Sequence, residues 1–301
     1  MMREDAPSDM DKRSPHSLVV WLRLMRLPGA LTAARDVVAG AAVAGAPLTP
    51  VTALVAFGSV LLYGAGMILN DVLDFKKDQQ YHPERPLPSK HITRRAAMLV
   101  GVSFLTLGAL TGFLIGGVFL GVTLSLALSI LLYDSRPGDV WILGPLLMGA
   151  CRGLNFARGL TISTEELQPI HLYAAGAFGF MIAGLTLISL LEEQKLPIRM
   201  KSTAVLAILI GTITPAAYAI PDHPLRTALL ALSGVALAAY VTEPVVRRQL
   251  PSLSVRRGVF SLPSYAVLYG VATERADAVL IGILILLAVY ASRRALAFYA
   301  S

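Results

Sequence analysis

Hydrophobic residues occur along this chain in runs of roughly 17 to 22, about the length of a helix that crosses the hydrocarbon core of a bilayer. Ten such segments are predicted: 27–46, 51–69, 96–116, 118–133, 141–160, 172–191, 203–220, 225–241, 259–271 and 278–290. The ninth is short and contains Pro263, which predicts a broken or tilted span. The pattern therefore predicts an all-α, polytopic membrane bundle of nine or ten transmembrane helices.

Composition agrees with this pattern and excludes an ordinary soluble domain. The 301 residues are 55% hydrophobic and only 15% charged, and the mean hydropathy is +0.65. Residues 1–17 are interpreted as a polar N-terminal tail without a cleaved signal peptide. Residues 18–301 are interpreted as a single transmembrane domain surrounded by membrane lipid.

Lysine and arginine gather in alternate connections between the predicted spans. The connections 46–50 and 161–169 contain neither residue, whereas the connections that follow the second, fourth, sixth and eighth spans are basic. Because basic loops are retained on the cytoplasmic side, both termini are predicted to be cytoplasmic. The simplest compartment is the inner membrane of a bacterium. This topology accounts for the net charge of +7, so the charge indicates no nucleic-acid partner.

The strongest chemical signal is a set of acids at the end of the second span. Asp71, Asp74 and Asp78 fall within about 60° of one another on a helix, and Asn70 lies just beside them. Three acids on one face repel one another unless cations neutralise them. Hard oxygen ligands of this kind suit Mg²⁺, which is usually held by a few carboxylates together with substrate phosphates. The motif therefore predicts a substrate that carries pyrophosphate and enters from the cytoplasmic side.

The simpler alternative is that these acids are solvated and pair with Lys76 and Lys77 at little energetic gain. The segment that follows weakens this alternative. Three prolines within residues 82–89 end the helix and hold an extended loop. Such a loop lets Arg85 fold back towards the acids, where its planar guanidinium suits phosphate oxygens.

These residues resemble the first signature of the UbiA family of intramembrane prenyltransferases. The resemblance is carried by Asn70-Asp71-x-x-Asp74-x-x-x-Asp78 and by Arg85-Pro86-Leu87-Pro88, which follow the second of many spans. It covers nearly the whole chain, including a basic entrance at residues 23–28. Tyr133-Asp134 and the segment 144–155, which ends in Arg-Gly-Leu-Asn, are similar to the EboC-like subgroup, whose own substrate is poorly defined.

The resemblance implies a helical bundle around a central cavity with a cytoplasmic cap. It also implies a prenyltransferase in which the three aspartates hold Mg²⁺ and bind an isoprenyl diphosphate. Loss of pyrophosphate then gives an allylic cation, which an aromatic or other lipophilic acceptor attacks. Arg85 would neutralise phosphate charge, with help from Arg136 or Lys195 in neighbouring loops.

The second acidic motif departs from the family pattern. Glu192 and Glu193 stand side by side just before Lys195, and adjacent residues on a helix point about 100° apart. One of the glutamates ligates a second Mg²⁺, or both are solvated acids at a helix end. The sequence leaves these two alternatives open.

Further substrate contacts are predicted from the fourth and fifth spans. The family's Tyr-x-x-x-Lys element is altered, so that Arg136 follows Tyr133 one position early. Charges inside a bilayer are costly unless they face a cavity or a partner. Arg152, with Asn155 nearly one turn on, is therefore a candidate for the cavity wall. Arg158 lies nearer the outer end, where snorkelling to the surface is favoured and a cavity role is the alternative.

The first span also contains a charged pair, Arg35 and Asp36. Asp36 either holds Arg152 across the bundle as a buried ion pair or binds a polar group of the acceptor, and the sequence does not decide between the two.

Two function hypotheses follow from these patterns. The first is an Mg²⁺-dependent prenyltransferase, which the intact first motif and Arg85 favour. The alternative is a catalytically weakened UbiA-like protein that binds or helps transport a lipophilic metabolite, which the altered second motif favours. Terpene cyclisation, which uses the same cation chemistry without an acceptor, is a minor third hypothesis.

Overall fold

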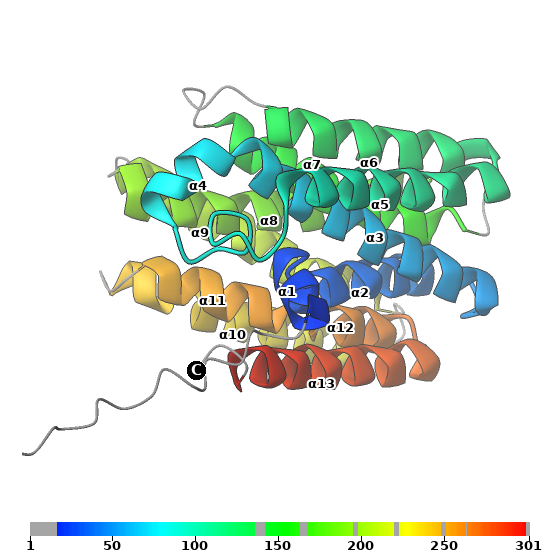
Figure 1. The fold of residues 1–301 in the computed structure, drawn as a ribbon. Coiled ribbons are helices and arrows are strands. Elements are labelled where there is room, and N and C mark those ends of the chain that lie inside the picture. The colour runs from blue at the N-terminus through cyan, green and yellow to red at the C-terminus, as the bar shows by residue number, and fades with distance from the viewer. Residues whose placement is uncertain are drawn as a thin grey trace, which may run out of the picture.

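The computed structural model describes residues 17–135, 142–162, 168–194, 198–219, 223–247, 251–262 and 264–298. Every regular element in these ranges is a helix, which confirms the predicted fold class (Figure 1). The helices are α1 Ser17–Leu24, α2 Leu27–Val43, α3 Pro50–Leu73, α4 Phe75–Tyr81, α5 Arg94–Ile115, α6 Gly117–Ser135, α7 Leu143–Leu160, α8 Pro169–Gln194, α9 Ile198–Ile213, the 3₁₀ helix η1 Thr214–Tyr218, α10 Pro224–Val246, α11 Pro251–Ser261, α12 Ser264–Ala272 and α13 Ala276–Phe298. The predicted tail falls almost entirely outside the described ranges.

Seven of the ten predicted spans coincide with segments that are long and apolar enough to cross a membrane. These are α3, α5, α6, α8, α9 with η1, α10 and α13. The other three predicted spans correspond to α2, α7 and the pair α11 and α12. The helix break expected near Pro263 is present, because α11 ends at Ser261 and α12 begins at Ser264.

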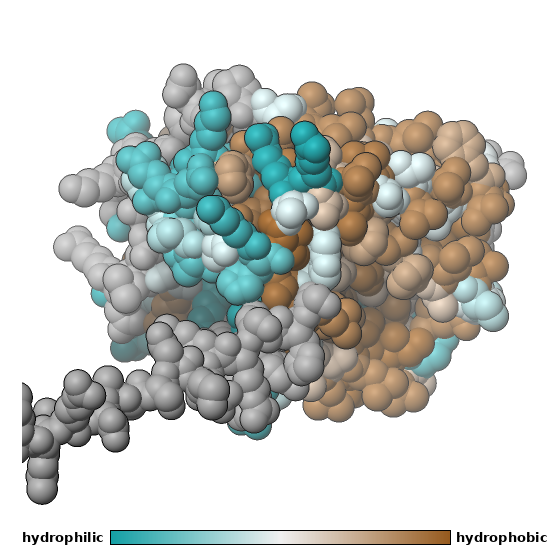
Figure 2. Space-filling view, viewed as in Figure 1, coloured by the Kyte–Doolittle hydropathy of each residue, from teal (hydrophilic) through white to brown (hydrophobic). Residues whose placement is uncertain are grey.

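The surface divides into a polar end and an apolar belt. Figure 2 shows hydrophilic residues gathered at the end of the bundle that carries α4, while hydrophobic residues cover most of the remaining face. Large apolar side chains such as Leu99, Phe113 and Leu114 are exposed on α5. In water this exposure would be unfavourable, whereas in a bilayer these side chains face lipid.

Helix α2 lies inside the bundle, where it packs against α3, α7, α12 and α13. Two glycines bring α2 and α7 unusually close together. A Cβ on Gly40 would overlap the carbonyl oxygen of Phe156, and one on Gly159 would overlap the carbonyl oxygen of Val37. Small residues at helix crossings are typical of membrane bundles. This crossing places polar side chains of α2 and α7 within hydrogen-bonding reach of one another.

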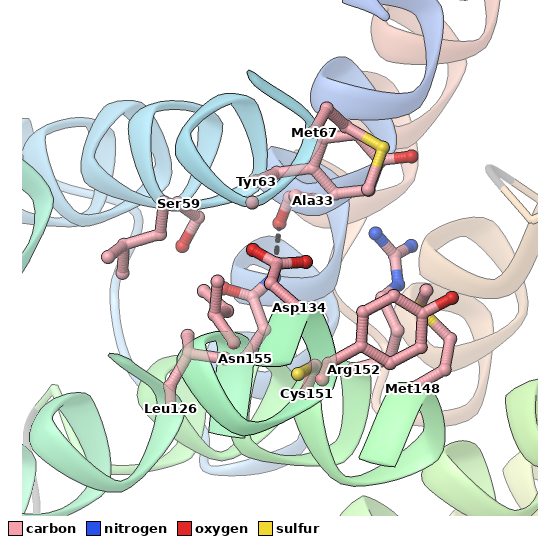
Figure 3. A pocket seen from close by; sticks show the side chains of 14 residues that line it. Ala33, Ser59, Tyr63, Met67, Leu126, Asp134, Met148, Cys151, Arg152 and Asn155 are labelled. Atoms are coloured by element: carbon pink, nitrogen blue, oxygen red, sulfur yellow. Dashed lines mark hydrogen bonds between the residues drawn. The ribbon is translucent and has the colours of Figure 1, made fainter. Parts of the chain in front are cut away.

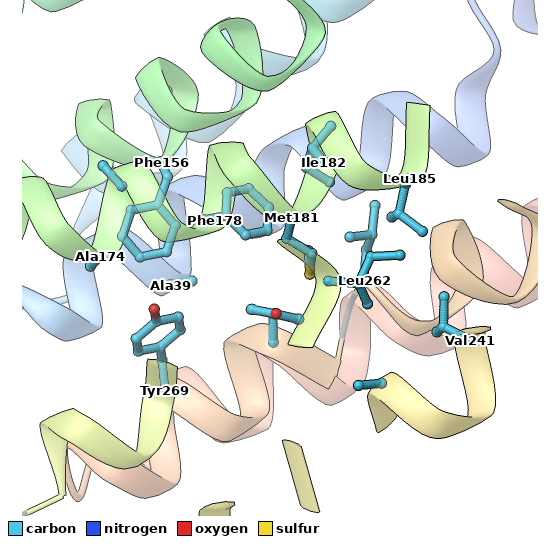
Figure 4. Close-up of a cluster of buried hydrophobic side chains, with 14 of the residues drawn as sticks. Ala39, Phe156, Ala174, Phe178, Met181, Ile182, Leu185, Val241, Leu262 and Tyr269 are labelled. Carbon is cyan, nitrogen blue, oxygen red and sulfur yellow. The ribbon is translucent and has the colours of Figure 1, made fainter. Parts of the chain in front are cut away.

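The largest hydrophobic cluster fills the space between α7, α8 and the C-terminal helices (Figure 4). Its centre is aromatic: the ring centroid of Phe178 lies 5.5 Å from that of Phe156 and 5.5 Å from that of Tyr265. The ring centroid of Tyr269 lies 5.4 Å from that of Phe156. Tilted aromatic pairs at such distances are favourable, so this half of the bundle has a well-packed core.

Candidate functional site

The acidic motif lies where α3 passes into α4. The main-chain N–H of Asp74 donates to the carbonyl oxygen of Asn70 at 2.8 Å, and that of Asp78 donates to Asp74 at 2.9 Å. Helical hydrogen bonding thus continues across the junction and keeps Asp71 and Asp78 on one side. Asp71 is 5% exposed and Asp78 is 3% exposed, whereas Asp74 and Asn70 are half-buried.

Arg85 folds back onto these acids, as expected from the proline-rich loop. Its Nη1 lies 2.7 Å from Oδ2 of Asp78 and 3.8 Å from Oδ1 of Asp71. Nη2 of Arg26 lies 3.4 Å from the same oxygen of Asp71. The backbone of Arg26 is left-handed, with φ of 52°. Such a conformation is uncommon for a residue with a side chain, and here it turns the chain between α1 and α2 beside the acids.

The chemistry of this donor set fits a hard divalent cation in part. Within the described ranges, no group of three or more histidine, cysteine, aspartate or glutamate side chains is arranged to hold a metal ion. Two buried carboxylates, those of Asp71 and Asp78, do converge on one guanidinium. Mg²⁺ commonly takes only one or two protein carboxylates and completes its shell with water and substrate phosphate. Asp71 and Asp78, with Asp74 beside them, therefore fit Mg²⁺ bound together with a diphosphate.

Four other predicted site residues fall where the structure gives no side-chain description. Arg136 and Lys195 lie outside the described ranges, and Glu192 and Glu193 lie in the last turn of α8, of which only the backbone is described. Their roles stay predictions.

A cavity lies inside the bundle, between α2, α3, α6 and α7 (Figure 3). Its empty space, including the part that opens outwards, is about 490 Å³. Met67, one turn before Asp71 on α3, lines the end nearest the acids. The lining is otherwise mainly apolar, and its polar members are Ser59, Tyr63, Tyr133, Asp134, Arg152 and Asn155.

Arg152 and Asn155 line this cavity, where the sequence predicted them, and both also hold Asp36. Nη2 of Arg152 lies 3.0 Å from Oδ2 of Asp36 and donates to Oγ1 of Thr32 at 3.1 Å. Nδ2 of Asn155 donates to Oδ2 of Asp36 at 3.1 Å and to the carbonyl oxygen of Ala33 at 2.8 Å. Asp36 is fully buried, so the structure resolves the alternatives left open by the sequence in favour of a buried ion pair.

Arg35 completes this network on the far side of Asp36. Its Nη2 lies 2.6 Å from Oδ1 of Asp36, and its guanidinium lies 5.0 Å from the centroid of the Phe178 ring. Two arginines thus share one carboxylate, so the group formed by Arg35, Asp36 and Arg152 has a net positive charge at the edge of the cavity.

Arg158 is fully buried, so the expectation that it snorkels to the outer surface is wrong. Three hydroxyl groups hold its guanidinium inside the bundle: Nε donates to Thr123 at 3.2 Å, Nη1 to Ser59 at 2.5 Å and Nη2 to Thr111 at 2.7 Å. These hydroxyls come from α6, α3 and α5. Hydroxyl groups inside the bundle therefore provide the polar contacts that a snorkelling arginine would make at the surface.

Two residues of the site carried no assigned role in the sequence. Arg26 belongs to the basic segment before the first span, and its contact with Asp71 depends on the turn into α2. Asp134 lines the cavity, and Figure 3 shows its carboxylate pointing inwards between α3 and α7. The sequence feature that could have indicated Asp134 is its position at the end of an apolar run, directly after Tyr133.

An all-helical bundle in which seven described helices are long and apolar enough to cross a membrane is the architecture of an integral, multi-pass membrane protein. The model of the UbiA prenyltransferase family matches residues 33–246, and the chain belongs to this family of prenyltransferases.

Named relatives and solved structures agree with this family. The chain is 28% identical over 207 residues to digeranylgeranylglyceryl phosphate synthase of Methanosarcina mazei, which covers 62% of this chain and 70% of the relative. The same enzyme of Methanothrix thermoacetophila is 30% identical over 140 residues, which is 46% of this chain and about half (52%) of the relative. Neither finding distinguishes the EboC-like subgroup, which stays a prediction.

The fold is similar to that of a UbiA homolog from Archaeoglobus fulgidus. In its complex with GPP and Mg²⁺ the TM-score is 0.65 at 15% identity, and the alignment covers 89% of this chain and 99% of that chain. In its complex with DMAPP and Mg²⁺ the TM-score is 0.64 at 16% identity, with 88% and 98% covered. At this identity the likeness establishes the fold alone.

Proposed function

We propose that this protein transfers an isoprenyl group from an isoprenyl diphosphate to an aromatic or other lipophilic acceptor within the membrane, with Mg²⁺ as cofactor. The observation that carries the proposal is the pair of buried carboxylates, Asp71 and Asp78, which Arg85 bridges one turn of α3 beyond Met67 in the cavity wall. The Archaeoglobus fulgidus homolog, whose fold is similar, was solved with Mg²⁺ and DMAPP or GPP.

At the acidic end of the bundle, the aspartates and the arginines hold the diphosphate in different ways. Mg²⁺, when bound by the aspartates, supplies a Lewis acid that neutralises charge on the departing pyrophosphate. Arg85 and Arg26 already lie beside Asp71, so their guanidinium groups are placed to donate to phosphate oxygens that enter there. Arg136 and Lys195 would make the same kind of contact with phosphate oxygens, and Glu192 or Glu193 at the end of α8 would ligate a second Mg²⁺.

The cavity receives the isoprenyl chain and the acceptor. Its apolar lining excludes water, so the activated isoprenyl carbon meets the acceptor instead of being hydrolysed. On the cavity wall, Nε of Arg152 and Oδ1 of Asn155 have no hydrogen-bond partner within the described residues.

The test is Mg²⁺-dependent binding of a non-hydrolysable isoprenyl diphosphate analogue to the detergent-solubilised protein, together with pyrophosphate release from the substrate. Asp71→Asn and Asp78→Asn are each expected to weaken binding on the order of 100-fold. Asp277→Asn is the matched control, because Asp277 pairs with Arg275 at the start of α13, away from the acidic motif. It is expected to bind normally.

Equal binding by the wild type and both variants would remove the case for a diphosphate site at this motif. Absence of binding by folded wild-type protein would favour the alternative function, in which the protein binds or helps transport a lipophilic metabolite.

A further inference from the structure

The acids of the motif lie on two helices. Asp71 belongs to the last turn of α3, which ends at Leu73, and Asp78 belongs to α4, which begins at Phe75. Asp74 lies between the two helices, with φ of −77° and ψ of 4°. These angles belong to the bridge region and depart from those of a regular α-helix. The distance between the carboxylates of Asp71 and Asp78 therefore depends on the angle between α3 and α4.

A side chain from a third helix contacts both sides of this junction. Arg94 is the first residue of α5, and its Nε donates to the carbonyl oxygen of Val72 at 3.2 Å. Its guanidinium lies 5.6 Å from the centroid of the Phe75 ring. Val72 directly follows Asp71 on α3, and Phe75 is the first residue of α4. One guanidinium thus joins the end of α3 to the start of α4.

The contact with Val72 suits the chemistry of a helix end. The last four carbonyl groups of an α-helix have no partner within the helix, and arginine side chains donate to them from outside. A cation at this end is also favoured by the helix dipole. Val72 is fully buried, so water does not contact its carbonyl. Arg94 therefore supplies a hydrogen bond that solvent does not supply there.

The position of Arg94 is fixed by the start and the packing of α5. Oγ1 of Thr93 accepts from the main-chain N–H of Ala96 at 3.2 Å and caps the helix. Gly101 lets α5 lie close against α3, because a Cβ there would lie 2.8 Å from Cδ2 of Leu69. The guanidinium of Arg94 thus extends from a helix that packs on α3 close to the acids.

Arg94 differs from the arginines that are placed to bind phosphate. Arg26 and Arg85 contact the aspartates directly, whereas Arg94 forms no ion pair with a carboxylate of the described residues. Its influence on the acids passes through the backbone of α3 and α4. The spacing of the acids matters because Mg²⁺ requires near-ideal octahedral geometry at about 2.1 Å. Removing a group that orients metal ligands from outside typically costs about 10- to 100-fold in affinity.

We propose that Arg94 is a positioning residue, which sets the angle between α3 and α4 and thereby holds Asp71 and Asp78 at the spacing that Mg²⁺ and a diphosphate require. The inference rests on the proposed function and deepens it, because it assigns a role in the diphosphate site to a residue that touches neither metal nor phosphate.

The first measurement is the Mg²⁺ concentration that gives half-maximal binding of a non-hydrolysable isoprenyl diphosphate analogue to the detergent-solubilised protein. Arg94→Met keeps a long side chain beside Phe75 but cannot donate to Val72, so this concentration is expected to rise about tenfold. Arg94→Lys keeps both a charge and a donor for the helix end, and it is expected to stay within about threefold of the wild type.

Arg95→Met is the matched control for charge. Arg95 is the next residue of α5, is exposed like Arg94, and makes no hydrogen bond or ion pair with the described residues. Its variant is expected to need the same Mg²⁺ concentration as the wild type. An equal rise in Arg94→Met and Arg95→Met would overturn the positioning role, because it would assign the effect to the loss of positive charge at this end of the bundle.

A second measurement needs neither metal nor substrate. Hydrogen exchange of the backbone amides of residues 74–78 reports how firmly α4 is held to α3. In Arg94→Met these amides are expected to exchange about tenfold faster than in the wild type and in Arg95→Met. Amides in the middle of α8 are expected to keep their wild-type rates, which shows that the variant is folded. Unchanged exchange at residues 74–78 would overturn the inference.

The two measurements separate this inference from the proposed function. Wild-type protein that binds no analogue would refute the diphosphate site itself. Binding by the wild type with the same Mg²⁺ requirement in Arg94→Met would refute only the positioning role, even if the amides of the junction exchanged faster.

Discussion

Arg152 and Arg158 lie on the same helix, six residues apart, and both are inside the bundle, at 5% and 0% exposure. Their surroundings differ in kind. Arg152 meets the carboxylate of Asp36, which it shares with Arg35. Arg158 meets neutral groups within the part of the chain that the structure describes, namely three hydroxyls and the ring of Phe119. One charge is balanced by an opposite charge, and the other is held by three dipoles.

This difference predicts opposite patterns of sensitivity to mutation. Around Arg152, removing one charged partner leaves another charge buried and uncompensated, which is strongly destabilising. Around Arg158, removing the arginine leaves only hydroxyls, whereas removing a hydroxyl leaves part of a buried cation without a partner. The charge itself should therefore matter most at the first site and least at the second.

The largest effect is expected for Asp36→Leu. Two arginines, Arg35 and Arg152, would lose their common carboxylate, and the cost of breaking a buried pair is about 3–5 kcal/mol of unfolding free energy. The measurement is denaturant-induced unfolding in detergent micelles. Asp277→Leu at the start of α13 is the control and is expected to change stability by less than about 0.5 kcal/mol. A loss as small as that of the control would show that the Asp36 network does not hold α2 against α7.

A smaller effect is expected for Arg152→Met. Asp36 keeps Arg35 as a partner at 2.6 Å, so the loss is that of hydrogen bonds to a charged group, about 1.5–3 kcal/mol. The double variant Asp36→Leu/Arg152→Met should lose less than the two single losses together, because Arg152→Met removes one of the two charges that Asp36→Leu leaves unpaired. Strict additivity in the same unfolding experiment would mean that the two side chains are not coupled.

Much of this fold was predictable because a bilayer demands long apolar helices. Seven of the predicted spans reappear as such helices, and the helix break near Pro263 appears between α11 and α12. The acidic motif was predictable for a related reason, since helical spacing alone brings Asp71 and Asp78 to one side. Arg85 followed from three prolines that end the helix after Asp78. All of these signals are local in sequence.

The surroundings of Arg158 were not predictable in this way. Its hydroxyl partners lie 35, 47 and 99 residues away along the chain, at Thr123, Thr111 and Ser59. Serine and threonine are ordinary members of apolar membrane helices, so nothing marked these three. Their meeting depends on how α3, α5, α6 and α7 pack, which the hydrophobic pattern does not encode. The same reason applies to Asp36. The sequence suggested Arg152 as its ion-pair partner but could not decide between this pair and a contact with the acceptor.

Removing one of the three hydroxyl partners of Arg158 tests how strongly neutral groups stabilise its buried charge. Ser59→Ala leaves one N–H of the Arg158 guanidinium without its partner at 2.5 Å, which is expected to cost about 1–2 kcal/mol of unfolding free energy. Ser129→Ala is the matched control, because Ser129 is half-buried and donates only to the carbonyl oxygen of Ser125. If both serine variants lose the same amount, the hydroxyl of Ser59 does not support the buried charge.

The smallest effect is expected for Arg158→Met, although it removes a whole charged side chain. Replacing a buried ionic group with an apolar one of similar length is often neutral, and Thr111 keeps its hydrogen bond of 2.6 Å to the carbonyl oxygen of Gly108. The unfolding free energy should therefore change by no more than about 1 kcal/mol in either direction. In this background Ser59→Ala should cost almost nothing, since no guanidinium remains to be orphaned. A loss as large as that of Asp36→Leu would break the comparison, because it would mean that Arg158 neutralises a carboxylate, as Arg152 does.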